Sequence, residues 1–404
     1  MAVGLENLSY LSPVAGIRLS VAEAGICYKD RDDVVIIEAC KGTSCAGVFT
    51  RNAFCAAPVM IAKKHMSEIE SRAFLINSGN ANAGTGESGM QAAMICCQSV
   101  AGALGLDENQ VLPFSTGVIG EPLPVDRIQK AVPELADQLD EDNWNTAAQA
   151  IMTTDTQAKG VSLKLDINGH EVNLTGIAKG SGMIRPDMAT MLAFIATDAG
   201  LDNVLLQDCL EQAVNQSFNR ITVDGDTSTN DACMLLATGK SGINLIAGDP
   251  GLSVFMQALT DVCMQLAQSI VRDGEGITKF ITVEVNGGGS GKECLDVAYT
   301  VAHSPLVKTA FFASDPNWGR ILAAVGRAGL ANLVLEDIKI YLGDVCIVEN
   351  GGRASTYTEE QGQTVMNQEE ITIRIELGRG KATETVWTSD LSYDYVKINA
   401  EYRT

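Results

Sequence analysis

Short apolar runs, separated by turns rich in glycine and asparagine, predict a chain of alternating strands and helices. The runs Val34–Ile37, Phe74–Asn77 and Phe280–Val285 are typical of strands, because apolar residues gather there between turn residues. Apolar residues at helical spacing over Leu252–Val271 predict one long helix. The mixture predicts an α/β fold class in which mixed sheets pack against helices.

The rest of the pattern adds further elements of both kinds. Helices are expected over Glu87–Leu104, Asp126–Leu139, Asn143–Met152, Asp202–Phe218 and Asp315–Ala328, and strands over Ile338–Leu342 and Ile371–Leu377. Asn168-Gly169 predicts the turn of a hairpin over residues 161–177. The glycine-rich run Gly287–Lys292 departs from a phosphate-binding loop at two positions, so it is interpreted as a hairpin loop.

One stretch carries candidate chemistry. Gly180, Gly182 and Pro186 predict an irregular connection, and the apolar run Met191–Ala196 predicts a strand buried on both faces. If the bond before Thr190 were cut, that residue would carry both a hydroxyl nucleophile and a free α-amine. An α-amine has a pKa of about 7.7–8.0 and can act as a base near neutral pH. The alternative is a plain tight connection that ends at a strand edge.

Three other places offer weaker signals. Thr116-Gly117 is expected in a turn, where it supplies a hydroxyl and unhindered backbone N–H groups that could face a developing oxyanion. Glu275 stands between two glycines, where a carboxylate is ordinarily just solvated. The loop 78–86 either cradles an anion at the start of the next helix or is a plain turn held by local asparagine bonds.

Composition excludes several functional classes. A length of 404 residues predicts two or three domains, and a net charge of −21 argues against nucleic-acid and anionic-membrane partners. The eleven cysteines lack a C-x-x-C pair and the three histidines lack metal-ligand spacing, so we expect reduced thiols and no metal site. No signal peptide and no membrane span are expected, which predicts a cytoplasmic protein.

The central stretch also resembles a known processing site. The run Lys179–Ile184, then Pro186, then Met188–Leu192 is similar to the self-cleavage site of the ornithine acetyltransferase (glutamate N-acetyltransferase) family. The resemblance continues through other motifs as far as Thr404. It implies the fold of a self-processing two-chain acyltransferase. It further implies cleavage between Ala189 and Thr190, which gives an alpha chain of residues 1–189 and a beta chain of residues 190–404.

The resemblance also assigns roles to residues. Thr190 is the expected nucleophile, and Thr116 and Gly117 are the expected oxyanion-stabilising pair. The implied substrate-binding residues are Thr153, Lys179, Thr190, Glu275, Asn399 and Thr404. The implied reaction of arginine biosynthesis moves the acetyl group of N2-acetylornithine through Thr190 to glutamate, without a metal or organic cofactor. The implied assembly is a heterotetramer of two alpha and two beta chains.

Three questions stay open at this point. No residue decides whether acetyl-CoA is a second acetyl donor. A self-processing amidase or aminopeptidase would use the same parts with water in place of glutamate. A non-enzymatic amino-acid-binding relative of the same fold would keep the motifs without the cut.

Overall fold

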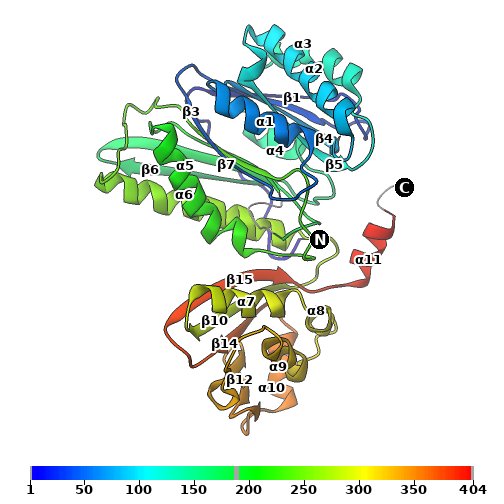
Figure 1. The fold of residues 1–404 in the computed structure, drawn as a ribbon, viewed down its shortest axis with the longest axis vertical. Helices are drawn as coiled ribbons and strands as arrows, with labels where there is room; N and C mark the ends of the chain where they lie inside the picture. The colour runs from blue at the N-terminus through cyan, green and yellow to red at the C-terminus, as the bar shows by residue number, and fades with distance from the viewer. Residues whose placement is uncertain (1, 186–190, 402–404) are drawn as a thin grey trace. The chain divides into compact units, whose positions relative to one another are not determined.

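The structure is a computed structural model that describes residues 2–185 and 191–401. It divides into two compact units, in keeping with the two or three that the length predicts (Figure 1). The larger unit contains residues 7–219 and 226–270, and the smaller unit contains residues 1–6, 220–225 and 271–404. The expected boundary between residues 189 and 190 therefore falls inside the larger unit, and it does not separate the two units.

The larger unit contains two mixed sheets. The first has the strand order β1-β2-β4-β5, and only β4 and β5 are parallel: β1 Ile17–Ala22, β2 Val34–Ala39, β4 Ala73–Asn80 and β5 Val111–Val118. The second has the order β3-β9-β8-β7-β6, and only β8 and β9 are parallel: β3 Ser44–Phe49, β6 Lys159–Ile167, β7 His170–Lys179, β8 Leu192–Thr197 and β9 Ala232–Ala237. A two-residue turn at Asn168-Gly169 joins β6 and β7, which confirms the predicted hairpin.

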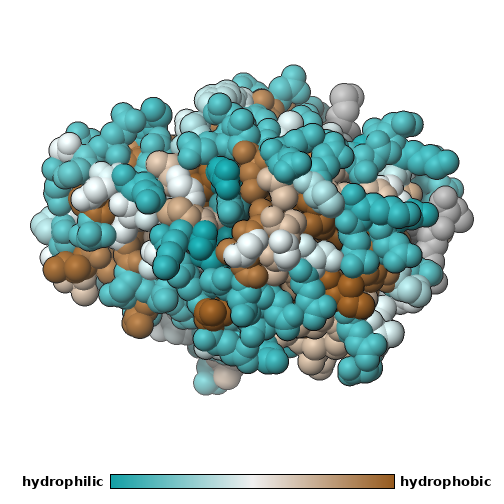
Figure 2. Space-filling model, turned by 90° about the horizontal axis from the view of Figure 1, so that it is seen from above, coloured by the Kyte–Doolittle hydropathy of each residue, from teal (hydrophilic) through white to brown (hydrophobic). Residues whose placement is uncertain are grey.

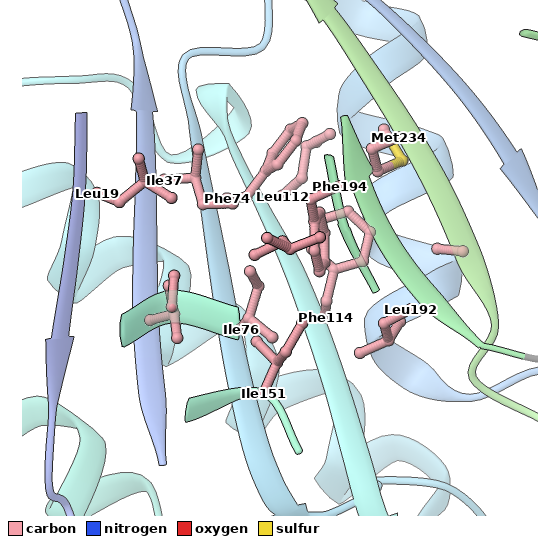
Figure 3. Close-up of a cluster of buried hydrophobic side chains, with 14 of the residues drawn as sticks. Leu19, Ile37, Phe74, Ile76, Leu112, Phe114, Ile151, Leu192, Phe194 and Met234 are labelled. Carbon is pink, nitrogen blue, oxygen red and sulfur yellow. The ribbon is translucent and has the colours of Figure 1, made fainter. Parts of the chain in front are cut away.

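The two sheets pack face to face around aromatic side chains. Phe74, Phe114 and Phe194 point toward one another in Figure 3, and their ring centroids lie 5.1–5.9 Å apart. Phe74 and Phe114 come from the first sheet and Phe194 from the second. The Phe74–Phe114 and Phe114–Phe194 pairs are edge-to-face, and pairs of this kind add to the stabilisation from buried area. The three rings therefore join the sheets.

Helices cover the outer faces and give four layers. Val35 and Ile37 of β2 face the second sheet, whereas Val34 and Ile36 join the cluster beneath α2 and α3, which explains an unbroken apolar strand. On the other side a Cβ at Gly176 of β7 would lie 3.1 Å from Leu266 of α6. The helices of this unit are α1 Ala57–Glu68, α2 Gly86–Leu104, α3 Val125–Asp137, α4 Trp144–Ala150, α5 Asn203–Gln216 and α6 Pro250–Arg272, with 3-10 turns η1 Glu108–Gln110 and η2 Phe218–Arg220 beside them.

The smaller unit has one six-stranded sheet with helices packed on it. The order is β13-β12-β11-β14-β10-β15, in which only β10 and β14 are parallel: β10 Phe280–Gly288, β11 Lys339–Leu342, β12 Val345–Glu349, β13 Gly352–Arg353, β14 Glu370–Glu376 and β15 Ala382–Ser389. Its helices are α7 Gly291–Ala302, α8 Pro305–Phe312, α9 Trp318–Gly326, α10 Glu359–Met366 and α11 Tyr393–Ala400, with the 3-10 turn η3 Leu335–Asp337. One buried cluster joins the sheet to α7 and α9.

The predicted fold class is confirmed, and three local interpretations are wrong. Gly287–Lys292 is no hairpin loop, because β10 continues to Gly288 and α7 begins at Gly291. Ser290 caps that helix by accepting a hydrogen bond from the Glu293 N–H at 3.3 Å. The helix expected to start at Asp315 instead starts at Trp318 behind the cap Asn317. Thr116-Gly117 lies within β5 and is not a turn.

Helix α6 is long and apolar enough to cross a membrane by length and composition, although no span was expected from the sequence. Half of its most apolar window is buried in the protein. Phe255, Leu259 and Leu266 of α6 are fully buried. The helix therefore has the burial of a core helix.

The exterior is largely polar. Hydrophilic residues cover most of the face shown in Figure 2, where hydrophobic residues form small separate patches.

All eleven cysteines are free and six of them are buried, in keeping with the expected reduced thiols. Burial raises the pKa of the Cys45 thiol to about 12, so this thiol stays protonated at neutral pH.

Replacing Phe114 tests the junction between the sheets. Phe114→Ala removes the ring that contacts both others, and we expect the free energy of unfolding to fall by about 3–5 kcal/mol in urea denaturation. The control is Phe54→Ala, because the Phe54 side chain is 80% exposed. That control should change the free energy of unfolding by less than about 0.5 kcal/mol. Equal effects of the two substitutions would contradict the assigned role of Phe114.

Candidate active site

The structure brings the candidate residues together in two groups. Thr116, Thr153 and Lys179 are in direct contact within the larger unit. Glu275 and Asn399 are in direct contact within the smaller unit. The remaining candidates, Ala189, Thr190 and Thr404, lie outside the described residues.

Lys179 is the centre of the first group. It is the last residue of β7 and is only 8% exposed, and its ammonium donates to Thr116 Oγ1 at 3.0 Å and to Thr153 Oγ1 at 2.9 Å. Its backbone pairs with Leu192, the first residue of β8. A buried cation thus lies beside the start of the strand that follows the expected cut. Thr116 and Thr153 come from distant parts of the chain, so no local pattern could show this contact.

Gly117 has no alternative at its position. Its φ is +135°, and a Cβ there would lie 2.2 Å from the Gly79 carbonyl carbon and 2.5 Å from the Asn80 nitrogen. Backbone of β4 and β5 approaches closely because Gly79 and Gly117 are paired in register at a bulge. The close approach fixes the backbone that carries Thr116.

Asparagine side chains form hydrogen bonds around the end of β5 and in the loop that follows β4. Ser115 Oγ donates to Asn77 Oδ1 at 2.6 Å, and Asn82 Nδ2 donates to the Gly89 carbonyl at 2.9 Å. Asn230 Nδ2 donates to the Ser115 carbonyl at 2.9 Å. These bonds favour the plain turn over the anion cradle for the loop 78–86, because its asparagines bond to neighbouring protein groups. Asn230 lies shortly before β9, so its bond to Ser115 links the start of β9 to β5.

Asp155 is a site residue that the sequence did not reveal. It is fully buried with Lys159, whose ammonium lies 2.6 Å from Asp155 Oδ1. The same oxygen accepts from the Gly180 N–H at 2.8 Å, and Oδ2 accepts from the Thr153 N–H at 3.0 Å. Asp155 therefore holds both the Thr153 turn and the residue after Lys179. The only signal in the sequence is a carboxylate inside the threonine run 153–156.

Charge neighbours control the ionisation of Asp155. Burial alone raises the pKa of this carboxyl, but the Lys159 and Lys179 ammonium groups and the Thr153 hydrogen bond outweigh burial. Together they hold the pKa of Asp155 well below its usual range. Asp155 is therefore ionised at neutral pH and balances part of the positive charge at the site.

Glu275 and Asn399 form the second group. Glu275 is only 7% exposed, so its carboxylate is not simply solvated on an open turn. Its Oε2 accepts a hydrogen bond from Asn399 Nδ2 at 2.8 Å. Asn399 lies on α11, which Ser392 caps and ties back by donating to the Gly276 carbonyl. A Cβ at Gly276 would lie 2.5 Å from the Tyr395 nitrogen, so the glycine admits the helix. The described part of the C-terminal segment is therefore folded against the Glu275 turn.

Substitutions at two glycines distinguish the cost of a steric clash with the backbone from the cost of a positive φ. Gly120 also has positive φ, at +85°, but a Cβ there would meet nothing within 4 Å. We expect Gly120→Ala to lower the free energy of unfolding by about 1–2 kcal/mol, which is the strain of the left-handed region alone. Gly117→Ala should cost more than about 3 kcal/mol in the same denaturation experiment, because backbone must move. Equal costs would show that the contact with Gly79 is not tight.

The Asp155–Lys159 pair predicts a specific acid sensitivity. Asp155→Asn removes the carboxylate that balances the charge of the buried Lys159 ammonium, and we expect the free energy of unfolding to fall by about 3–5 kcal/mol at pH 7. Because the folded pKa of Asp155 is lowered, its contribution is complete above pH about 4 and is lost as pH falls below that value. In urea denaturation, the difference in the free energy of unfolding between wild type and variant should become smaller from pH 7 to pH 3. A constant gap would contradict the assignment.

Comparison with known proteins identifies the family. Residues 18–404 match the model of the ArgJ family. The chain is 59% identical over 406 residues to the arginine biosynthesis bifunctional protein ArgJ of Pseudomonas fluorescens (strain Pf0-1), with all of both chains covered. It is 55% identical over 407 residues to the protein of the same name from Psychrobacter arcticus (strain DSM 17307 / VKM B-2377 / 273-4), again with complete coverage.

A solved structure agrees with this assignment. The crystal structure of the arginine biosynthesis bifunctional protein argJ from Bacillus halodurans matches with a TM-score of 0.50 and 41% identity. The match covers 53% of this chain and 100% of that chain. These findings confirm the family resemblance that the motifs indicated. The chain belongs to the ArgJ family and is an acyltransferase of arginine biosynthesis.

Proposed function

We propose that this ArgJ-family enzyme transfers the acetyl group of N2-acetylornithine to glutamate through an acetyl ester of Thr190. Water first adds across the Ala189–Thr190 peptide bond, which leaves a carboxylate on Ala189 and a free amine on Thr190. The products are the alpha chain, residues 1–189, and the beta chain, residues 190–404. The single observation that carries the proposal is the buried Lys179–Thr116 contact beside the strand that follows Thr190.

The transfer needs no cofactor to balance. The Thr190 hydroxyl oxygen attacks the acetyl carbonyl while the Thr190 amine takes the hydroxyl proton. The tetrahedral intermediate then breaks its C–N bond, and the proton passes to the departing ornithine nitrogen. The α-amine of glutamate attacks the resulting ester, N-acetylglutamate leaves, and the proton returns to the Thr190 oxygen.

The Lys179 contact supports the oxyanion role of Thr116. Because the Thr116 oxygen accepts a hydrogen bond from the Lys179 ammonium, its own O–H remains to donate elsewhere. The adjacent cation polarises that O–H and makes it a stronger donor to a negatively charged oxygen. Gly117 adds a backbone position without a side chain. One donor of this kind is typically worth about 3–4 kcal/mol of transition-state stabilisation.

The remaining residues suit an amino-acid substrate. Glu275 offers a carboxylate for an ammonium group of ornithine, and the bond from Asn399 orients it. Thr153 and the Lys179 ammonium suit the substrate carboxylate, since a buried cation favours an anionic partner. Thr404 takes its proposed part from the family resemblance.

The sheet and a solved relative support the cleavage step. Strands β7 and β8 are antiparallel neighbours, so hydrogen bonds hold both ends of the connection after a cut. The argJ chain from Bacillus halodurans is covered completely by 53% of this chain, about 214 of its 404 residues. That length matches the 215 residues of the proposed beta chain. A relative of half length is consistent with processing.

The proposal extends to assembly, location and a second donor. We propose a cytoplasmic heterotetramer of two alpha and two beta chains, by analogy with the family. The relatives carry the word bifunctional in their names. We therefore include acetyl-CoA as a second acetyl donor to glutamate. An assay with acetyl-CoA and glutamate, but without N-acetylornithine, tests this activity directly.

The experiment that tests the function replaces Thr190. Thr190→Ala should remain a single polypeptide of the full 42.8 kDa and should transfer no acetyl group, because it lacks the hydroxyl. Thr190→Ser is the matched control and should be cut and retain activity, since it keeps a hydroxyl and an α-amine. The readouts are a denaturing gel, N-terminal sequencing of the smaller products and ornithine release with and without glutamate.

Several results would contradict the proposal. A second fragment that does not begin Thr-Met-Leu-Ala-Phe would place the cut elsewhere. Equal ornithine release with and without glutamate would identify a hydrolase, and an uncut wild type without activity would identify a binding protein.

A further inference from the structure

The loop that joins β1 to β2 borders the candidate site of the larger unit. It spans residues 23–33, whereas the loops of β-hairpins usually have about 2–5 residues. Val34 at the start of β2 pairs with Asn77 of β4, and Asn77 pairs with Ser115 of β5. The loop therefore lies at the edge of the first sheet where β4 and β5 end, which is the edge that carries Thr116. The proposed mechanism uses no residue of this loop.

One side of the loop packs on the ends of β4 and β5. A Cβ at Gly79 would lie 2.6 Å from Cys27 Cβ and 3.4 Å from the Cys27 nitrogen. Gly79 is the residue that pairs with Gly117. The Ser78 N–H beside it donates to the Asp33 carbonyl at 2.9 Å. The loop is therefore in direct contact with the backbone next to the expected oxyanion position.

Arg31 holds the other side of the loop. Its Nη2 donates a hydrogen bond to the Met152 carbonyl. Met152 directly precedes Thr153, whose hydroxyl accepts from the Lys179 ammonium at 2.9 Å. The Arg31 Cζ atom also lies 5.1 Å from the centre of the Tyr28 ring, a cation–π contact that orients the guanidinium. Arg31 is thus fixed one residue away from the group around Lys179.

The positive charge of Arg31 is available to a ligand. Its guanidinium makes no ion pair with a carboxylate in the part of the chain that the structure describes, and its two contacts are uncharged. Asp33 interacts with it electrostatically, but the Asp33 oxygens accept from the Ala24 and Ile26 N–H groups at 2.7 and 2.5 Å. A guanidinium has five N–H donors, so the backbone bond leaves others unused. The Arg31 side chain is half-buried and remains accessible.

The proposed reaction needs a second cation for its acceptor. N-Acetylornithine carries one carboxylate and a cationic side chain, whereas glutamate carries a second carboxylate on its side chain. Lys179 suits the α-carboxylate of either molecule, which leaves the side-chain carboxylate of glutamate without a partner. Lys159 is no candidate, because Asp155 already balances its charge.

We infer that Arg31 binds the side-chain carboxylate of the glutamate acceptor. The inference rests on the proposed function and adds a residue that determines its specificity. The planar donors of a guanidinium match the two oxygens of a carboxylate. The same charge repels the ammonium of an ornithine side chain. Arg31 therefore selects the acceptor and takes no part in breaking or forming bonds.

The test measures the two half-reactions separately in the purified, cleaved enzyme. In a ping-pong reaction, kcat/KM for each substrate reports the half-reaction of that substrate. Arg31→Gln should lower kcat/KM for glutamate by about 10- to 100-fold, because a charge-assisted hydrogen bond is lost. The value for N-acetylornithine should stay within about threefold, since its side chain has no carboxylate. The readouts are initial rates of ornithine release and N-acetylglutamate formation over a range of both substrates.

Glutamine is the matched acceptor, because its side chain has the shape of glutamate with a neutral amide. Wild type should prefer glutamate to glutamine by at least about tenfold in kcat/KM, and Arg31→Gln should bring the two values within about threefold. Arg31→Lys keeps the charge without the planar donors, so its kcat/KM for glutamate should lie between those of wild type and Arg31→Gln. If Arg31→Gln does not fold or is not cut, Arg31→Lys carries the test, because it must still lower the value for glutamate alone.

Arg127→Gln is the control substitution. Arg127 of α3 is exposed and also donates to a backbone carbonyl of this loop, that of Gly25. The same change of residue therefore removes an arginine from the same loop without removing the charge beside Thr153. Arg127→Gln should leave kcat/KM for glutamate and for N-acetylornithine within about threefold of wild type.

Three outcomes would overturn the inference. An equal fall for glutamate and N-acetylornithine in Arg31→Gln would indicate a structural role or a contact with the shared α-carboxylate. An unchanged preference for glutamate over glutamine would show that the side-chain carboxylate lies elsewhere. A loss confined to acetyl-CoA as the donor would assign Arg31 to its phosphate groups.

The inference and the proposed function fail separately. A wild type that is not cut before Thr190, or that releases ornithine equally without glutamate, refutes the proposed function. A cut enzyme that transfers acetyl to glutamate, and whose Arg31→Gln kinetics match those of wild type, refutes only the role of Arg31.

Discussion

The pairing of β8 with its two neighbours is the constraint on which the site depends. β8 lies between β7, which ends at Lys179, and β9, which begins after Asp231. Backbone hydrogen bonds in both ladders align these two strand ends with Met191. Charged groups from two separate stretches of sequence are thus set beside one chain position. Any slip of register by one residue would turn alternate side chains to the opposite face and dismantle the arrangement.

Burying charge at this end of the sheet requires compensation, and the fold supplies it in steps. Lys179 is stabilised by two threonine hydroxyls, and Asp155 contributes a nearby negative charge that Lys159 balances in turn. Each member is hydrogen-bonded, which is the condition under which buried ions are tolerated. Asp231 departs from this pattern because one of its oxygens has no partner among the described residues. The departure singles it out from the otherwise satisfied network.

The sequence predicted most elements, because long apolar runs and turn signals are local. The strand over Val34–Ile37 and the hairpin at Asn168-Gly169 illustrate this, since each depends on residues a few positions apart. It misjudged Gly287–Lys292, where a glycine run hid the cap at Ser290. At the site, resemblance supplied the residue roles, but the contacts of Lys179 with Thr116 and Thr153 join positions 63 and 26 residues away. Such contacts follow from tertiary packing, which no local pattern encodes.

If the chain is cut before Thr190 as proposed, the order of strands has a thermodynamic consequence. Strands β8 and β9 would come from one product, and β3 and β7 on either side of them from the other. The N-terminal tip also belongs to the smaller unit, where the Val3 N–H donates to the Arg272 carbonyl. Two polypeptides that contribute neighbouring strands to one sheet cannot dissociate without breaking the hydrogen bonds of that sheet. Denaturation would release two molecules where one was present, so the midpoint of melting would rise with protein concentration, as it does for an obligate heterodimer.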